Sequence, residues 1–212
     1  MSAPQSYYVP VDAGEAEFTE KRSHFLGHVR RVETEAEARA FLDEMRKKYY
    51  DARHNCWCYV LHEGGVVRYG DDGEPQGTAG QPMLNVFQRE GVENVVCVVT
   101  RYFGGVLLGA GGLTRAYAKS AKDALDAAGK ARMRLWFAVT VDCPYPMLER
   151  LKLLAAAHGG TVEGTDFGAA VSVRILLPQE NAAGFDAALT ELSAGTMTAR
   201  REGERFLPGP RE

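Results

Sequence analysis

The spacing of apolar residues over the first 130 positions predicts a mixture of strands and helices. Residues 23–32 alternate between apolar and polar types, as in a strand with one buried face. Thr34 and Glu37 form a capping box, and the apolar residues after it recur at helical spacing as far as Tyr50. Gly64–Gly65 between two apolar runs is typical of a hairpin. The predicted elements are, in order, a strand (23–32), a helix (34–50), two strands (55–61 and 66–69), a helix that begins at Pro82, a buried strand (92–100) and a helix (112–128) that ends at Gly129.

The pattern becomes simpler after the charged segment Lys130–Arg134, where we place a domain boundary. The predicted elements beyond it are a strand (135–142), a helix (145–157), two strands (161–163 and 169–177), a helix (181–192) and a last strand (196–201). This β-α-β-β-α-β order is the ferredoxin-like arrangement. We therefore predict an α+β fold with two domains, residues 1–130 and 131–207, followed by a loose tail at residues 208–212.

The composition places the chain among ordinary globular proteins. The net charge of −3 argues against a surface coated with positive charge, although it leaves room for a local basic patch. No apolar run is long enough to cross a membrane, and the first residues lack the pattern of a signal peptide. We expect a cytoplasmic protein with no membrane partner.

The four cysteines agree with that expectation. They are Cys56, Cys58, Cys97 and Cys143, and three of them lie in apolar runs that resemble strands. Cys56 and Cys58 are too close together for a zinc knuckle or for a redox Cys-x-x-Cys pair. We expect small, reduced, buried side chains, and we predict neither a metal site nor a cofactor.

A glycine-rich loop at residues 104–112 is the first candidate site. Gly104 and Gly109 have the spacing of a P-loop, but Ala110–Gly111 occupy the positions of its Lys and Ser/Thr, and the dinucleotide pattern fails at its last position. Two interpretations remain. The glycines either leave bare amides at a helix start, where an anion can bind, or they let the loop pack closely on the sheet. The candidate anion- or nucleic-acid-binding residues are Arg101, Gly104, Gly105, Gly111, Gly112, Arg115 and Lys119.

An acidic loop upstream is the second candidate. Asp71, Asp72 and Glu74 could ligate Mg²⁺ or act as general acid and base, and they could equally stabilise turns, since Asp-Gly and Glu-Pro are turn dipeptides. The neutral polar residues Gln76 and Thr78 suit hydrogen bonds to a partner or to the neighbouring loop. A further pair, Arg53 and His54, stands at the start of a predicted strand, where His54 is either a site residue or a strand-end hydrogen bonder.

Together these loops resemble the IMPACT family, and within it the bacterial YigZ-like branch. The resemblance covers about residues 15–128, and its motifs are Arg53–Trp57, Asp71–Gly80, Val99–Gly105 and Leu108–Tyr117. It implies an N-terminal α/β sandwich similar to the second domain of ribosomal protein S-five, and a C-terminal domain similar to a ferredoxin-like module of elongation factor G. Eukaryotic members of the family restrain a kinase that acts on translation initiation, using an additional N-terminal domain. For the bacterial branch the resemblance implies binding to nucleic acid or the ribosome.

Three functions follow as hypotheses. The first is a non-catalytic cytoplasmic binding protein that engages RNA, the ribosome or a translation factor through Arg101, Arg115, Lys119 and the glycine-loop amides. The second is a metal-assisted hydrolase that uses Asp71, Asp72 and Glu74. The third is a protein–protein interaction module in which the two loops form a docking surface.

Overall fold

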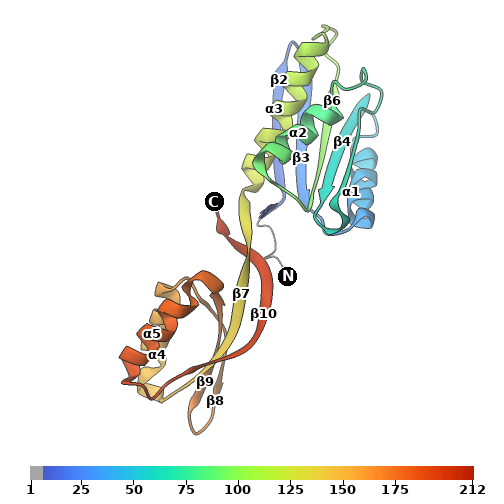
Figure 1. Ribbon diagram of the computed structural model, residues 1–212. Coiled ribbons are helices and arrows are strands. Elements are labelled where there is room, and N and C mark those ends of the chain that lie inside the picture. Colours follow the sequence, from blue (N-terminus) through green and yellow to red (C-terminus); the bar gives the residue numbers. More distant parts are fainter. Residues whose placement is uncertain (1–6) are drawn as a thin grey trace. The chain divides into compact units, whose positions relative to one another are not determined.

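A five-stranded antiparallel sheet forms the centre of the first of two units in this computed structural model, which describes residues 7–212. The strand order is β2-β3-β6-β4-β5. The elements of this unit are β1 (Tyr8–Pro10), β2 (Gly14–Glu20), β3 (Ser23–Arg31), α1 (Glu35–Lys48), β4 (His54–Leu61), a 3₁₀ turn (Glu63–Gly65), β5 (Val66–Gly70), α2 (Gly80–Glu90), β6 (Val95–Tyr102) and α3 (Ala110–Ala128). Figure 1 shows that α2 and α3 lie on one face of the sheet and α1 on the other.

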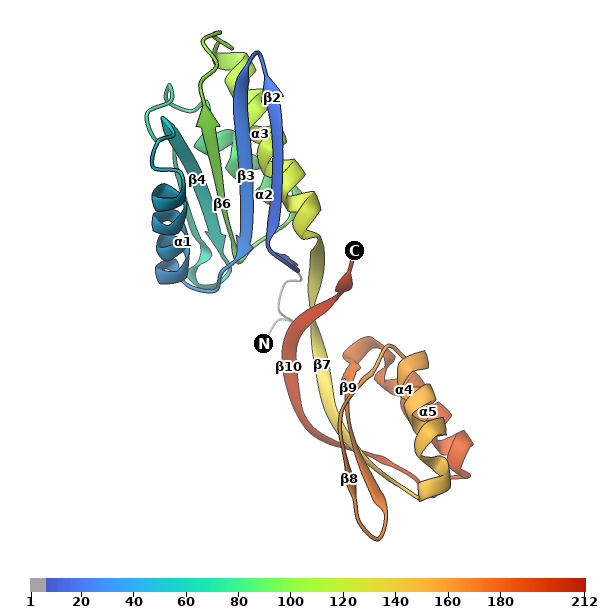
Figure 2. The same cartoon turned by 180° about the vertical axis from the view of Figure 1, so that it is seen from behind.

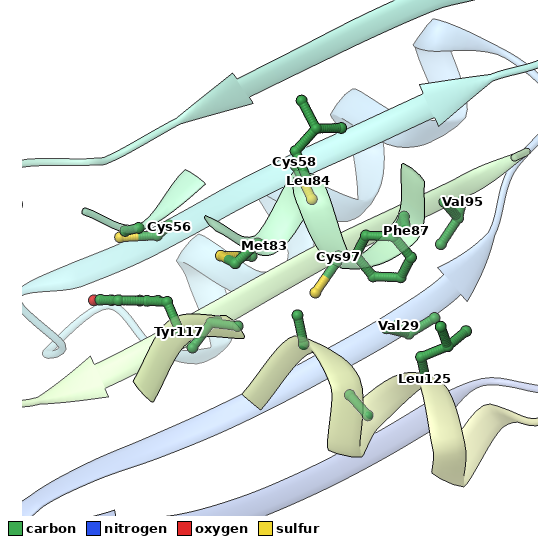
Figure 3. Packing of buried hydrophobic residues seen from close by; sticks show 14 of the residues in the cluster. Val29, Cys56, Cys58, Met83, Leu84, Phe87, Val95, Cys97, Tyr117 and Leu125 are labelled. Atoms are coloured by element: carbon green, nitrogen blue, oxygen red, sulfur yellow. The ribbon is translucent and has the colours of Figure 1, made fainter. Parts of the chain in front are cut away.

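Helices on both faces explain why β6 is an almost continuous apolar run. Cys97 and Val99 belong to the core under α2 and α3, whereas Val96 and Val98 pack with Phe41 of α1 on the opposite face. Figure 3 shows the first of these cores, in which Met83 and Phe87 of α2 and Tyr117 and Leu125 of α3 face the sheet.

The four cysteines are buried and form no disulfide, which confirms the expectation that they act as small core residues. Burial raises the pKa of the Cys56 and Cys58 thiols. Cys56 Sγ donates a hydrogen bond to the carbonyl oxygen of Asp71 at 2.9 Å, so this thiol stabilises the backbone of the acidic loop.

The second unit has the predicted ferredoxin-like order of elements. They are β7 (Lys130–Cys143), a 3₁₀ turn (Tyr145–Met147), α4 (Leu148–Ala157), β8 (Thr161–Phe167), β9 (Val171–Pro178), a second 3₁₀ turn (Gln179–Asn181), α5 (Ala182–Ser193) and β10 (Ala199–Arg211). Strand β7 pairs with β9 and with β10, and β9 also pairs with β8. Leu151 of α4 and Phe185 of α5 pack on the sheet with Val141 and Val173. The α+β, two-domain fold class is confirmed.

The division between the units falls inside β7 and β10. The first unit extends to Arg132 and includes Pro208–Glu212, and the second spans Met133–Leu207. The loose tail expected at residues 208–212 is wrong, because Pro208–Arg211 continue β10 and the Glu212 amide donates to the Lys130 carbonyl at 2.9 Å. Among the described residues, no helix has both the length and the apolar character that a membrane span requires.

Candidate functional site

Four segments meet at one end of the first unit's sheet. The turn between β2 and β3 and the loop that follows β6 lie at the same end, because His24 pairs with Tyr102 (Figure 2). The start of β4 joins them, since His54 pairs with Arg101. The acidic loop at residues 71–79 completes the group through its hydrogen bonds to β4. We call this region the loop end.

Asp71 holds the acidic loop in shape. Its carboxylate accepts hydrogen bonds from the backbone amides of Gly77 (2.8 Å), Ala79 (3.0 Å) and Gly80 (2.8 Å). The amides of Ala79 and Gly80 lie at the start of α2, where the N-cap residue Ala79 has no side chain that could accept a hydrogen bond. Asp71 therefore caps α2 from a distance in sequence.

Asp72 and Thr78 also have local structural roles. The Asp72 carboxylate accepts from the Asn55 amide at 2.7 Å, which fixes the loop to β4. Thr78 Oγ1 donates to the Pro75 carbonyl at 2.6 Å, so it closes a turn and is buried there. Gln76 is exposed. Within residues 7–212 no three His, Cys, Asp or Glu side chains are grouped so that they could hold a metal ion.

Glu74, the third acid, is buried in an ion pair with Arg101. Arg101 Nη1 donates to Glu74 Oε1 at 2.7 Å, and the Tyr117 hydroxyl donates to the same oxygen at 2.8 Å. Arg101 Nη2 also reaches Ser23 Oγ at 3.1 Å. Burial raises the pKa of the Tyr117 hydroxyl, so it remains a proton donor to the carboxylate. Arg101 is 5% exposed. The sequence placed Arg101 among the anion-binding residues, and the structure gives it a carboxylate partner inside the protein.

His54 lies beside this pair with a defined orientation. Its Nδ1 is 2.9 Å from the Asp72 carbonyl oxygen, and its Nε2 is 4.0 Å from Glu74 Oε1. The acidic loop therefore sets the orientation of the imidazole, and the ring edge with Nε2 faces the ion pair.

The glycines of the loop after β6 have two different roles. A Cβ on Gly104 would lie 1.9 Å from the Arg22 carbonyl oxygen, and a Cβ on Gly112 would lie 2.9 Å from Leu108 Cβ, so both are required for close packing. Gly105 has a φ of +84° and open space around it, and at Gly111 the nearest atom would be Arg115 Nη1 at 3.5 Å. The close-packing interpretation therefore holds at Gly104 and Gly112, whereas anion binding near Gly105 and Gly111 stays a prediction.

Helix α3 begins at Ala110 without a side-chain cap. Its N-cap residue is Gly109, with a φ of 71°. A helix of 19 residues presents the positive end of its dipole and its first amides at such a start. Gly109 and Ala110 line a cleft at the loop end, so this helix start faces the candidate site.

Four exposed cations border residues 103–112, and we call them the basic rim: Lys21, Arg22, Arg53 and Arg115. Within residues 7–212 none of the four side chains makes an ion pair or a hydrogen bond. Lys119, by contrast, pairs with Asp123 one helical turn away. Sequence reasoning missed Lys21 and Arg22, which lie about 80 positions from the glycine loop and form the β2–β3 turn.

A cleft of about 330 Å³ opens at the loop end. Its polar wall contains Arg53, His54, Glu74 and Arg101. Its apolar wall is formed by Pro75, Phe103, Leu107, Leu108 and Leu113. Leu107 is 81% exposed and Phe103 is 40% exposed, so the apolar side of the mouth is open to solvent.

The chain matches two family descriptions. Residues 21–125 match the Impact N-terminal domain, and residues 141–196 match a domain of unknown function, DUF1949. It is 35% identical over 200 residues to IMPACT family member YvyE of Bacillus subtilis (strain 168), covering 94% of this chain and 92% of that protein. It is 34% identical over 180 residues to IMPACT family member YigZ of Escherichia coli (strain K12), covering 84% and 88%.

A solved structure agrees with these matches. It is described as the crystal structure of an hypothetical protein, and it is 32% identical to this chain, with a TM-score of 0.59 and coverage of 93% of this chain and 97% of that one. The fold and these matches define a class of two-domain α+β proteins in which an Impact N-terminal domain is followed by DUF1949. The chain belongs to the IMPACT family, as its loop motifs indicated.

Proposed function

We propose that this protein is a non-catalytic cytoplasmic binding protein that engages RNA through the basic rim, in connection with translation. The observation that carries the proposal is the gathering of four unpaired, exposed cations around one loop. Cations elsewhere in the first unit are largely paired with carboxylates, as Arg30, Arg31 and Lys130 are. Positive charge left without a partner in the protein is available to phosphate groups.

The rest of the loop end suits an unpaired strand of RNA. The uncapped start of α3 adds bare amides beside the rim, which favour a phosphate. Phe103 stands exposed in the same loop, and an aromatic face next to basic side chains is the arrangement on which unstacked bases bind. The link to translation rests on the resemblance to the bacterial branch of the family, which implies binding to nucleic acid or the ribosome.

The test is the salt dependence of RNA binding. Fluorescence anisotropy with a labelled ten-nucleotide RNA is measured between 50 and 200 mM KCl for the full chain and for the variant R22E/R53E/R115E. For single strands the slope of log K against log salt falls by roughly 0.7 for each lost phosphate contact, so the triple variant should lose about two units of slope.

The matched control is R89E. Arg89 is also exposed and makes no ion pair or hydrogen bond within residues 7–212, but it lies in the last turn of α2, before β6 begins, and so away from the loop end. Binding that is insensitive to salt, or an equal loss in R89E and the triple variant, would contradict the proposal.

The exposed Val106 and Leu107 favour a protein partner as the second candidate. Capture of partners from a cell lysate, with and without nuclease, separates the two. RNA binding predicts that nuclease abolishes the captured material, whereas a protein docking surface predicts that the same proteins remain and that L107S removes them.

A further inference from the structure

The cleft at the loop end has hydrogen-bonding capacity that the protein itself does not use. Glu74 Oε1 accepts both from Arg101 and from Tyr117, whereas Oε2 has no partner within residues 7–212. The Glu74 side chain is only 4% exposed, but its unpartnered Oε2 keeps some contact with solvent. Because Glu74 lines the cleft, we infer that this oxygen opens into it.

His54 supplies a second acceptor next to the first. A carbonyl oxygen can only accept, so the 2.9 Å contact with the Asp72 oxygen assigns the proton of the neutral ring to Nδ1. The lone pair is then on Nε2, which is 4.0 Å from Glu74 Oε1, and both residues line the cleft. The floor of the cleft therefore presents two neighbouring acceptors, one on the carboxylate and one on the imidazole.

The walls restrict the occupant further. Phe103, Leu107 and Leu113 form an apolar side, and a volume of about 330 Å³ is at the small end of ligand pockets, which span roughly 300–1,000 Å³. Two guanidinium groups, Arg53 and Arg101, line the cleft together with the single carboxylate of Glu74. A cationic ligand would meet this excess of positive charge, whereas a neutral ring attached to a phosphate would be stabilised by it.

We propose that the cleft binds one unstacked guanine base of RNA, an inference that rests on the proposed function. Guanine is the base whose Watson–Crick edge carries two adjacent donors, N1–H and the N2 amino group. These match His54 Nε2 and Glu74 Oε2. Adenine and cytosine place a donor next to an acceptor, and uracil places its imino donor between two acceptors. The ring packs against Phe103 and Leu107, and the phosphate lies toward Arg53 and the start of α3.

The decisive experiment changes the RNA and leaves the protein intact. Anisotropy is measured with the full chain at pH 8 and 100 mM KCl, on ten-nucleotide oligouridylates that carry one central guanine, inosine, N1-methylguanine or adenine. A matched base edge is worth a discrimination of about tenfold. We expect the guanine strand to bind about tenfold more tightly than the all-uridine strand, inosine to lose part of this gain, and N1-methylguanine and adenine to lose all of it.

The protein variants F103A and V106A provide a matched pair. Both residues are exposed in the same loop, but only Phe103 lines the cleft. F103A should reduce the guanine preference and leave the salt slope unchanged, and V106A should change neither.

The outcomes separate the two proposals. Equal, salt-dependent binding of all five strands overturns guanine recognition and leaves RNA binding standing, whereas no binding of any strand overturns both. Displacement of the RNA by phenethylamine more strongly than by guanosine would show an amine site, and would overturn the guanine proposal alone.

Discussion

Arg101 Nη1 and Glu74 Oε1 are 2.7 Å apart in a pocket that leaves both side chains about 5% exposed. The two residues are 27 positions apart, one at the end of β6 and the other in the acidic loop. Their contact holds the acidic loop against the sheet. Two charged residues that resembled ligand-binding groups therefore pair with each other and line the floor of a cleft. Removing one partner would leave the other charge buried and uncompensated.

We therefore expect R101M to lower the free energy of unfolding by about 3–5 kcal/mol, and E74Q to lower it by a similar amount. The double variant E74Q/R101M should lose less stability than the sum of the two single losses, since no charge is then left alone. Urea unfolding of the four proteins measures the coupling. The exposed pair Glu35–Arg39, with the same kind of contact at 2.8 Å, is the control, and R39M should change stability little. Additive losses in the double variant would contradict the buried pair.

The sequence predicted most of the fold because the core follows the apolar pattern. The run before Tyr102 has to be buried on both faces, and the capping box at Thr34 opens α1 as expected. Strand β2 was missed because its Glu-Ala-Glu-Phe alternation has a half-exposed apolar side. Strand β10 was predicted too short because its outer residues are mostly exposed and it contains two prolines. The loose tail was wrong for that reason.

The candidate site could be predicted only in part. Motif positions identified two loops that the fold brings together at the loop end, but pairing across the sheet decides which charges are available. Arg101 lies opposite Glu74, a relation that no local spacing contains, whereas Lys21 and Arg22 join the site through strand register. The sequence held one usable signal, two cations between alternating segments at 14–20 and 23–31.

The contrast between Gly104 and Gly111 gives a second prediction. G104A would place Cβ 1.9 Å from the Arg22 carbonyl, so the loop or the turn has to move, and we expect a loss of about 1–3 kcal/mol together with weaker RNA binding. G111A meets ordinary space in the first turn of α3 and should stabilise the protein by about 0.4–1 kcal/mol. Thermal unfolding and anisotropy on both variants check this. A G104A variant with unchanged stability and RNA binding would contradict the close packing at Gly104.

His28 predicts a dependence of stability on pH. Burial holds the pKa of this side chain below its ordinary value of 6.5, against the raising effect of Glu15, and its Nε2 has no hydrogen-bond partner. As the pH falls through 6.5, His28 therefore binds a proton in the unfolded chain before it does so in the folded protein. The contribution of neutral His28 to the free energy of unfolding is fully present above pH 6.5. It is lost as the pH drops toward the pKa of His28 in the folded protein, by at most about 1.4 kcal/mol per pH unit for one group.

Urea unfolding between pH 8 and 5.5 should show this decline in the unmodified chain, and H28L should remove His28's contribution. The charged groups around His28 are Glu15, Lys48 and Arg30, and all remain in the variant. H24Q, at the half-exposed histidine of the same strand, should retain the decline. A decline that survives in H28L at full size would assign it to another group.

The β2–β3 turn offers a test that separates function from stability. Lys21 and Arg22 have φ values of 45° and 66°, and they form a two-residue turn between β2 and β3. Two-residue hairpin turns with positive φ at both positions favour Asn-Gly, and the left-handed conformation costs other residues about 1–2 kcal/mol each. K21N/R22G should therefore raise the free energy of unfolding by about 1 kcal/mol or more. If these cations contact phosphates, the same variant binds RNA more weakly and with a smaller salt slope. The reversed-charge turn K21E/R22E keeps the unfavourable φ values and should lose binding without the gain in stability. A more stable K21N/R22G variant with unchanged RNA affinity would remove the turn from the proposed contact surface.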